Sequence, residues 1–125
     1  MQRISDIYRD KCERRRDWRE VERLLGVAEL ADQAGRCMNC GQPFCHAYGC
    51  PLGNLAPDQN RAVAQGDWRL AYDLLSAHSD FPEFTSRICP ALCEASCVHQ
   101  LDEESVMVRQ SEKRIIETAF AIGWV

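Results

Sequence analysis

The chain has 125 residues, a length that suits one domain. Its formal net charge of −4, from 15 basic and 19 acidic side chains, gives no general attraction to nucleic acid or to anionic lipid. The sequence shows neither a secretion signal nor an apolar run as long as the roughly 18 residues of a membrane span, so we expect a cytoplasmic protein that binds no nucleic acid and no membrane.

Helices are the predicted elements of the first half of the chain. Apolar residues three and four positions apart predict a helix over residues 17–34, interrupted or capped near Gly26 or Gly35. Glycine and proline residues predict a loop over residues 37–57. A short helix is expected over residues 58–65, with an aspartate at its N-terminal cap.

The sequence of the second half of the chain also predicts helices, and it contains no run of residues that indicates a β-strand. Asp67 suits the cap of a helix over residues 68–78. Residues 79–90 are expected to be irregular because prolines interrupt them. A proline at the first helical position predicts a short helix over residues 90–97, and a last helix is expected over residues 111–120. The predicted fold class is therefore all-α.

Seven of the eight cysteines fall into two groups, and Cys12 stands apart. The first group lies in CMNCGQPFCHAYGCP and the second in CPALCEASC. The members are Cys37, Cys40, Cys45 and Cys50 in the first group, and Cys89, Cys93 and Cys97 in the second. Because cytoplasmic thiols stay reduced, so many cysteines in such a chain indicate metal or redox chemistry.

Three kinds of cysteine site compete for this pattern. Zinc sites often draw their four ligands from two CxxC pairs, and this chain has a single CxxC, from Cys37 to Cys40. Disulfides require an oxidising compartment, for which the sequence gives no sign. Iron–sulfur clusters use runs in which a CxxC is followed by further cysteines and one cysteine precedes a proline. The spacing favours iron–sulfur clusters and leaves zinc and disulfides as alternatives.

The spacing of the second group bears on the number of clusters. If residues 89–97 are helical, the three thiols share one face, and Cys89 and Cys97 lie about 12 Å apart along the axis at 1.5 Å per residue. One cubane is too small to take both thiols, so this group is expected to serve two clusters. Two cubanes need eight ligands and the groups supply seven. The eighth is Cys12 or a side chain other than cysteine.

Longer motifs surround the cysteines, and they are similar to motifs of a known protein family. These motifs are QAGRCMNCGQPFCHAYGCPLGNLAP, GDWRLAYDLL, DFPEFTSRICPALCEASC and VMVRQSEKRIIETAFAIGWV. On them the chain resembles the N-terminal iron–sulfur domain of glutamate synthase small (beta) subunits, which also opens dihydropyrimidine dehydrogenase and related flavin oxidoreductases. The resemblance runs from about residue 20 to the C-terminus. It implies an α-helical ferredoxin-like fold with long cysteine-bearing loops around two 4Fe-4S clusters, preceded by an extension over residues 1–20.

The resemblance also implies a ligand set for each cluster. The first cluster would take Cys37, Cys40, Cys45 and Cys97. The second would take Cys50, Cys89, Cys93 and a side chain of the last helix, Glu112. In the related dehydrogenase the corresponding ligand is a glutamine. No catalytic residue is expected in this chain.

The resemblance finally implies a task in electron transfer. In the family this domain precedes domains that bind FAD and NADPH, and this chain has no glycine-rich nucleotide fingerprint and ends about where the linker to the flavin domain would begin. We therefore expect a part of an NADPH-dependent oxidoreductase that is not catalytic alone. It would relay electrons between FAD and the FMN and clusters of a glutamate synthase large subunit. The alternatives are an interaction module stapled by clusters or zinc, and the equivalent domain of another flavin oxidoreductase.

Overall fold

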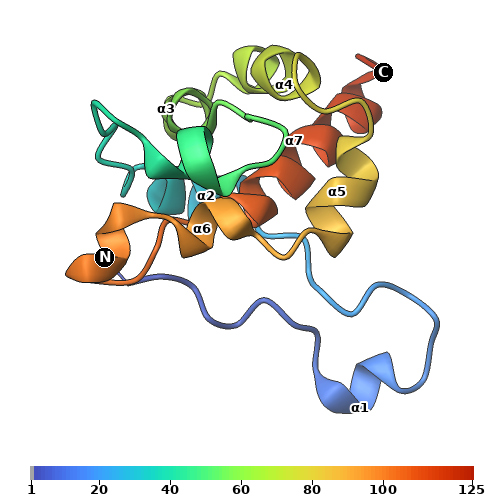
Figure 1. Cartoon of the computed structure of the whole chain (residues 1–125). Coiled ribbons are helices and arrows are strands. Elements are labelled where there is room, and N and C mark those ends of the chain that lie inside the picture. The colour runs from blue at the N-terminus through green and yellow to red at the C-terminus, as the bar shows by residue number, and fades with distance from the viewer. Residues whose placement is uncertain (1) are drawn as a thin grey trace.

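Helices dominate the computed structural model, which describes residues 2–125 (Figure 1). The α-helices are α1 (Lys11–Arg14), α2 (Val27–Ala34), α3 (Ala56–Ala64), α4 (Trp68–Ser76), α5 (Pro82–Ile88), α6 (Leu92–Ala95) and α7 (Arg109–Ile122). A π-helical turn, η1 (Cys45–Gly49), and a 3-10 turn, η2 (Val98–Leu101), complete the order. Within the described residues, β-pairing is limited to one antiparallel bridge between Tyr8 and Glu22. The prediction of an all-α domain is confirmed.

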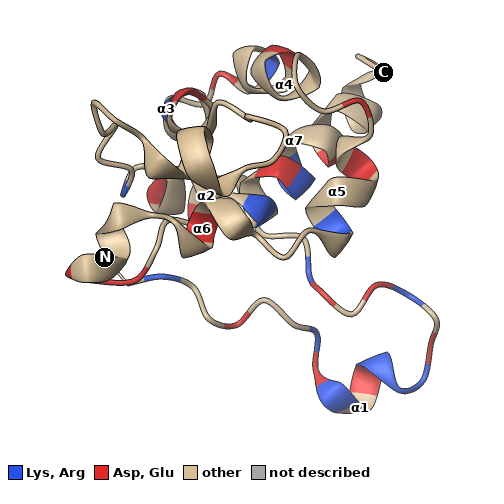
Figure 2. Ribbon diagram, in the orientation of Figure 1, with Lys and Arg blue, Asp and Glu red and all other residues tan. Residues whose placement is uncertain are grey.

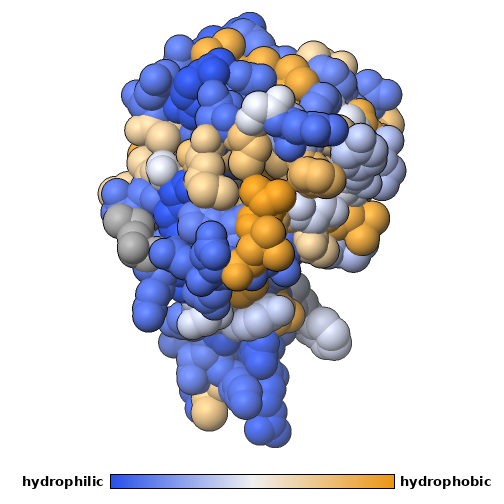
Figure 3. Space-filling view, turned by 60° about the vertical axis from the view of Figure 1, so that its left-hand side comes forward, coloured by the Kyte–Doolittle hydropathy of each residue, from blue (hydrophilic) through white to orange (hydrophobic). Residues whose placement is uncertain are grey.

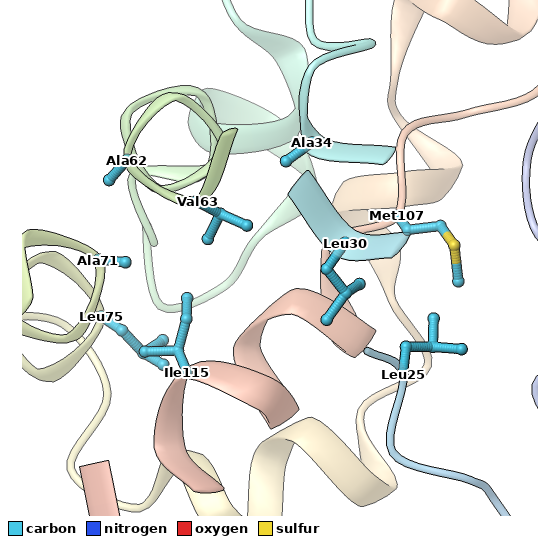
Figure 4. Close-up of a cluster of buried hydrophobic side chains, with 9 residues drawn as sticks. All are labelled: Leu25, Leu30, Ala34, Ala62, Val63, Ala71, Leu75, Met107 and Ile115. Carbon is cyan, nitrogen blue, oxygen red and sulfur yellow. The ribbon is translucent and has the colours of Figure 1, made fainter. Parts of the chain in front are cut away.

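The hydrophobic core lies where α2, α3, α4 and α7 meet (Figure 4). Its buried members are Leu25, Leu30, Ala34, Ala62, Val63, Ala71, Leu75, Met107 and Ile115. In Figure 4, Leu75 of α4 and Ile115 of α7 point toward one another. Removing one such side chain fully from water stabilises the fold by roughly 1.5–3 kcal/mol. This core gives the cysteine-bearing loops a rigid base.

The helix expected over residues 17–34 is shorter in the structure, because α2 begins only at Val27. Gly26 is its N-terminal cap, so the cap expected near Gly26 is confirmed, whereas the helix predicted over residues 17–25 was wrong. The residues before Gly26 are extended and pair with the chain near Tyr8. The N–H of Arg9 donates to the carbonyl of Val21, and that of Arg23 donates to Ile7, both at 2.9 Å. This pairing uses the backbone groups that a helix would need.

Helices α3 and α4 lie close to the positions that the sequence predicts for them. Helix α3 begins at Ala56, two residues before the predicted start, and a proline occupies its first turn. The predicted aspartate cap was wrong, because the N-terminal cap is Leu55. The Oδ1 atom of Asp67 accepts the N–H of Leu70 at 3.0 Å and caps α4, as predicted. Gly66 between the two helices has a φ of 75°, which glycine adopts without strain.

Two predictions about residues 79–97 were wrong. Residues 82–88 form α5, with Pro82 in its first turn, where an irregular segment was expected. Helix α6 covers only Leu92–Ala95, because Ala91 adopts a left-handed conformation with a φ of 56°. Cys89 and Cys97 therefore lie outside the helix. The separation of 12 Å, which assumed one continuous helix, does not apply.

An N-terminal arm, residues 2–24, extends from the helical body and carries α1 at its tip (Figure 1). Acidic and basic residues are interspersed along it (Figure 2). Ion pairs hold its returning segment against the body: Glu20 pairs with Lys113 at 2.6 Å, and Glu22 pairs with Arg109 at 2.6 Å. Among residues 2–125, no helix is both long and apolar enough to cross a membrane.

Candidate metal centre

The four cysteines predicted for one cluster line one cavity, of about 430 Å³ including space open to solvent. These are Cys37, Cys40, Cys45 and Cys97. Cys37 and Cys40 lie in the loop after α2, Cys45 begins η1, and Cys97 follows α6. The remaining wall is largely apolar and includes Phe44, Val106 and Val108. We call this the first cavity.

A second cavity, of about 860 Å³ including open space, is lined by the other predicted set. That set is Cys50, Cys89, Cys93 and Glu112. Exposed apolar side chains surround it, among them Leu52, Leu92 and Ile88, which is 79% exposed. Cys93 lines both cavities. Cys12 lines neither, since it lies in α1 on the arm.

Apolar surface also accompanies the first cavity. Figure 3 turns toward the viewer the side of the molecule that lies on the left in Figure 1, and an apolar band crosses it between hydrophilic areas. Large apolar side chains that are exposed close to the first-cavity cysteines in sequence are Met38, Phe44, Tyr48 and Leu101. Both cavities therefore lie beside exposed apolar side chains.

The π-helical turn connects the two cavities. The N–H of Cys50 donates to the carbonyl of Cys45 at 2.9 Å, the bond from residue i+5 to residue i that defines such a turn. Cys45 thereby faces the first cavity while Cys50 faces the second. Turns of this kind are frequent at functional sites.

A close approach of two backbones holds this turn against α6. A Cβ atom on Gly49 would lie 2.8 Å from the carbonyl oxygen of Leu92, 2.8 Å from Oγ of Ser96 and 2.9 Å from the Cα of Cys93. These separations are shorter than van der Waals contact, so only glycine fits without displacement. The cysteine loop and the helix that carries Cys93 are thus pressed together.

Backbone N–H groups point at two thiols of the second cavity. Asn54 donates its N–H to Sγ of Cys50, and Ala91 donates its N–H to Sγ of Cys89, both at 3.4 Å. Hydrogen bonds to the sulfur atoms of metal ligands tune a bound metal.

Burial raises the pKa of the inner thiols. It raises the pKa of Cys45 to about 11; the N–H of His46 opposes this, and the nearby thiols of Cys37, Cys97 and Cys40 add to it. Burial also raises the pKa of Cys93, and the carboxylates of Glu112 and Glu94 add to the effect. These thiols keep their protons at neutral pH unless a cation displaces them, as metal binding does.

Glu112 is the unusual group of the second cavity, because it is only 6% exposed. Its Oε1 accepts the side-chain N–H of Asn54 at 2.9 Å, and it forms no ion pair with any of residues 2–125. Burial raises its pKa to about 7, against the hydrogen bond from Asn54. A buried carboxylate without a cation is costly, and a metal ion would remove that cost.

The donor chemistry of both cavities fits iron–sulfur clusters. Cysteine thiolates are the usual ligands of these clusters, and a carboxylate oxygen completes the second set. No three histidine, cysteine, aspartate or glutamate side chains within residues 2–125 are arranged to hold a single metal ion. In a 4Fe-4S cluster each thiolate binds its own iron, so its ligands need not converge on one point.

Two residues of the site were missed in the sequence. Glu94 on α6 is buried, and its Oε1 accepts the N–H groups of Val108 and Arg109, each at 2.9 Å. Asn54 bonds to both Cys50 and Glu112. Their positions in the sequence could have identified them, because Glu94 directly follows Cys93 and Asn54 lies four residues after Cys50.

Comparisons with known proteins agree with this chemistry. Residues 14–124 match the family described as dihydropyrimidine dehydrogenase domain II, 4Fe-4S cluster. The chain is 51% identical over 112 residues to the glutamate synthase (NADPH) small chain of Mycobacterium tuberculosis, covering 90% of this chain and 23% of that protein. It is 38% identical to the Bacillus subtilis small chain, covering all of this chain and 27% of that protein. It is 40% identical to the glutamate synthase (NADH) of Saccharomyces cerevisiae, covering 98% of this chain and 6% of that protein. The chain thus spans less than a third of each relative.

Proposed function

This chain belongs to the dihydropyrimidine dehydrogenase domain II, 4Fe-4S cluster family, and from that premise we propose that it holds two 4Fe-4S clusters that relay electrons in a glutamate synthase. It is an iron–sulfur electron-transfer domain of the glutamate synthase small-chain type. The finer assignments concern the ligands, the number of clusters and the partners.

The ligand assignment rests on one observation: all four donors of each predicted set line one cavity, and Cys93 alone among them lines both. In the proposal, Cys37, Cys40, Cys45 and Cys97 hold the first cluster. Cys50, Cys89, Cys93 and Glu112 hold the second. The agreement is informative because donors of both sets come from segments far apart in the sequence.

The proposed task follows from how the chain arranges its own residues. A bound 4Fe-4S cluster takes up and releases one electron at a time. The thiols bind it, the apolar walls exclude water, and the N–H groups of Asn54 and Ala91 tune it. Because Cys93 lines both cavities, the two clusters would be neighbours, as a relay requires.

The partners are proposed from the relatives named above. FAD and NADPH would be bound by other domains, of the same chain or of another one. Electrons would pass from FAD through the two clusters to the FMN and clusters of a glutamate synthase large subunit. There they would support the formation of glutamate from glutamine and 2-oxoglutarate. This chain would perform no chemistry on carbon, because its assigned residues serve ligation and tuning.

Metal analysis tests the proposal first. We expect about eight iron and eight acid-labile sulfide per chain, the content of two cubanes, in protein purified without air. One or two zinc and no sulfide, even after anaerobic reconstitution, would overturn it. A redox titration then separates a relay from a structural module, because a relay must cycle reversibly and a structural staple need not.

A further inference from the structure

Asn54 makes three contacts that join separate parts of the site. Its backbone N–H donates to Sγ of Cys50 at 3.4 Å, and its Nδ2 donates to Oε1 of Glu112 at 2.9 Å. Its carbonyl oxygen lies 3.2 Å from Nδ1 of His46, the residue after Cys45. The side chain of Asn54 therefore reaches α7, while its backbone binds the loop after Cys50 and the π-helical turn.

We propose that Asn54 is the positioning residue that makes Glu112 an iron ligand, by occupying one carboxylate oxygen so that the other is presented to the second cavity. The inference rests on the proposed function, since it needs a cluster there. Oε1 of Glu112 is taken by Asn54, and Oε2 has no hydrogen-bond partner among residues 2–125. A carboxylate held at one oxygen cannot turn freely.

The chemistry of an amide suits this role. A lysine or arginine in its place would neutralise Glu112 and compete with iron for the carboxylate. An aspartate would present an acceptor where a donor is needed and would repel Glu112. The amide N–H donates without cancelling the charge, so Glu112 remains available to a cation.

The burial of Asn54 argues against a role in stability alone. The residue is 4% exposed, and its Oδ1 is buried without a hydrogen-bond partner. A buried polar atom that lacks a partner costs free energy, and an apolar side chain of similar size would avoid that cost. Other buried amides share this cost, but the one side-chain hydrogen bond that Asn54 makes within residues 2–125 goes to the proposed ligand Glu112.

Gln33 on α2 offers a matched control. It is 2% exposed, its Nε2 donates one hydrogen bond, to the carbonyl of Gln2 at 2.9 Å, and its Oε1 is also buried without a partner. It lines neither cavity. Replacing Gln33 by alanine thus removes a similar buried amide that contacts neither Glu112 nor a cavity-lining cysteine through a side-chain hydrogen bond.

The test compares four variants of the full chain after anaerobic reconstitution: Asn54→Ala, Asn54→Asp, Glu112→Ala and Gln33→Ala. Iron and sulfide content, the EPR spectrum of the oxidised protein and the potential of each cluster are measured. We expect Asn54→Ala, Asn54→Asp and Glu112→Ala each to lose about one iron per chain and to show the EPR signal of a 3Fe-4S cluster, because the corner iron would lack its ligand. Gln33→Ala should keep the full content and the wild-type potentials.

The outcomes separate this inference from the proposed function. A wild-type chain that takes up no cluster overturns the proposed function itself. A Glu112→Ala variant with full iron and an unchanged spectrum overturns the assignment of Glu112 and the inference with it. If Glu112→Ala loses iron but both Asn54 variants keep it, only the role of Asn54 is wrong. Asn54→Asp, which preserves shape, keeps the test decisive if Asn54→Ala does not fold.

Discussion

Glu94 on α6 accepts the backbone N–H of Arg109, the first residue of α7, at 2.9 Å. The same oxygen accepts the N–H of Val108 at 2.9 Å, and the other carboxylate oxygen pairs with Arg3. A carboxylate at a helix N-terminus accepts hydrogen bonds from N–H groups that have no partner within the helix. Its negative charge also interacts favourably with the positive end of the helix dipole. The helix that carries Cys93 is thereby tied to the start of the helix that carries Glu112.

Replacing Glu94 tests this link. Glu94→Ala leaves two N–H groups without their acceptor, and we expect the free energy of unfolding to fall by roughly 1–3 kcal/mol. Glu94→Gln retains an acceptor of similar shape and should lose less. Urea unfolding of protein purified without air measures both. If the free energy of unfolding falls equally in the two variants, Glu94 stabilises the fold through its charge and not by capping α7.

The close contact at Gly49 leads to a second prediction. Gly49→Ala places a methyl group 2.8 Å from the carbonyl of Leu92, so the cysteine loop must shift away from α6. We expect a loss of roughly 1–3 kcal/mol in unfolding free energy, as in other overpacked sites, together with reduced iron content. Gly41→Ala is the control, because no atom lies within 4 Å of its added Cβ. Wild-type iron content in Gly49→Ala would contradict the tight packing.

Local signals in the sequence predicted the elements that depend on neighbouring residues. Asp67 marked the start of α4 because a cap acts within one turn. The cap at Gly26 was visible for the same reason. The extended stretch before Gly26 was not, because its pairing partner near Tyr8 lies more than ten residues away. Helix α5 was missed because Pro82 was taken for an interruption when it begins the helix.

The candidate site shows the same difference between local signals, which the sequence reveals, and contacts between distant segments, which it does not. The cysteine groups were evident from spacing, but the expected eighth ligand depended on a continuous helix over residues 89–97 that the structure does not contain, so it stays a prediction. Spacing could not identify Glu112, because only the packing of α7 brings this residue to the second cavity. The contacts of Glu94 and Asn54 are likewise tertiary, and no periodicity or local motif predicts them.

The eight cysteines differ in their expected importance. Cys45 lines the first cavity, so Cys45→Ala should lose about four of eight iron per chain. Cys12 is exposed on the arm and lines neither cavity, so Cys12→Ala should retain all of the iron. Iron and sulfide analysis after anaerobic reconstitution measures both variants. A loss of iron in Cys12→Ala would make Cys12 a ligand and would count against Glu112.

The ion pair between Glu22 and Arg109 makes stability depend on pH. Burial alone would raise the pKa of Glu22, but hydrogen bonds from Arg109 and Gln110 lower it on balance. A lowered pKa contributes stability above the ordinary glutamate value of about 4.3, and that contribution is lost as the pH falls through the folded-state pKa. Glu22→Gln should therefore unfold at a lower temperature than wild type at pH 7.

The size of that difference should change with pH in one direction only. The gap in Tm between wild type and Glu22→Gln should be widest at neutral pH and should close as the pH falls through the lowered folded-state pKa of Glu22, because the carboxyl group is then protonated in both the folded and the unfolded wild type. Any acid loss of clusters affects both proteins and cancels in the comparison. Glu13→Gln is the control, since Glu13 is exposed on α1 and forms no ion pair within residues 2–125. A gap that stays constant from pH 7 to pH 3 would show that Glu22 stabilises the arm through packing and not through its charge.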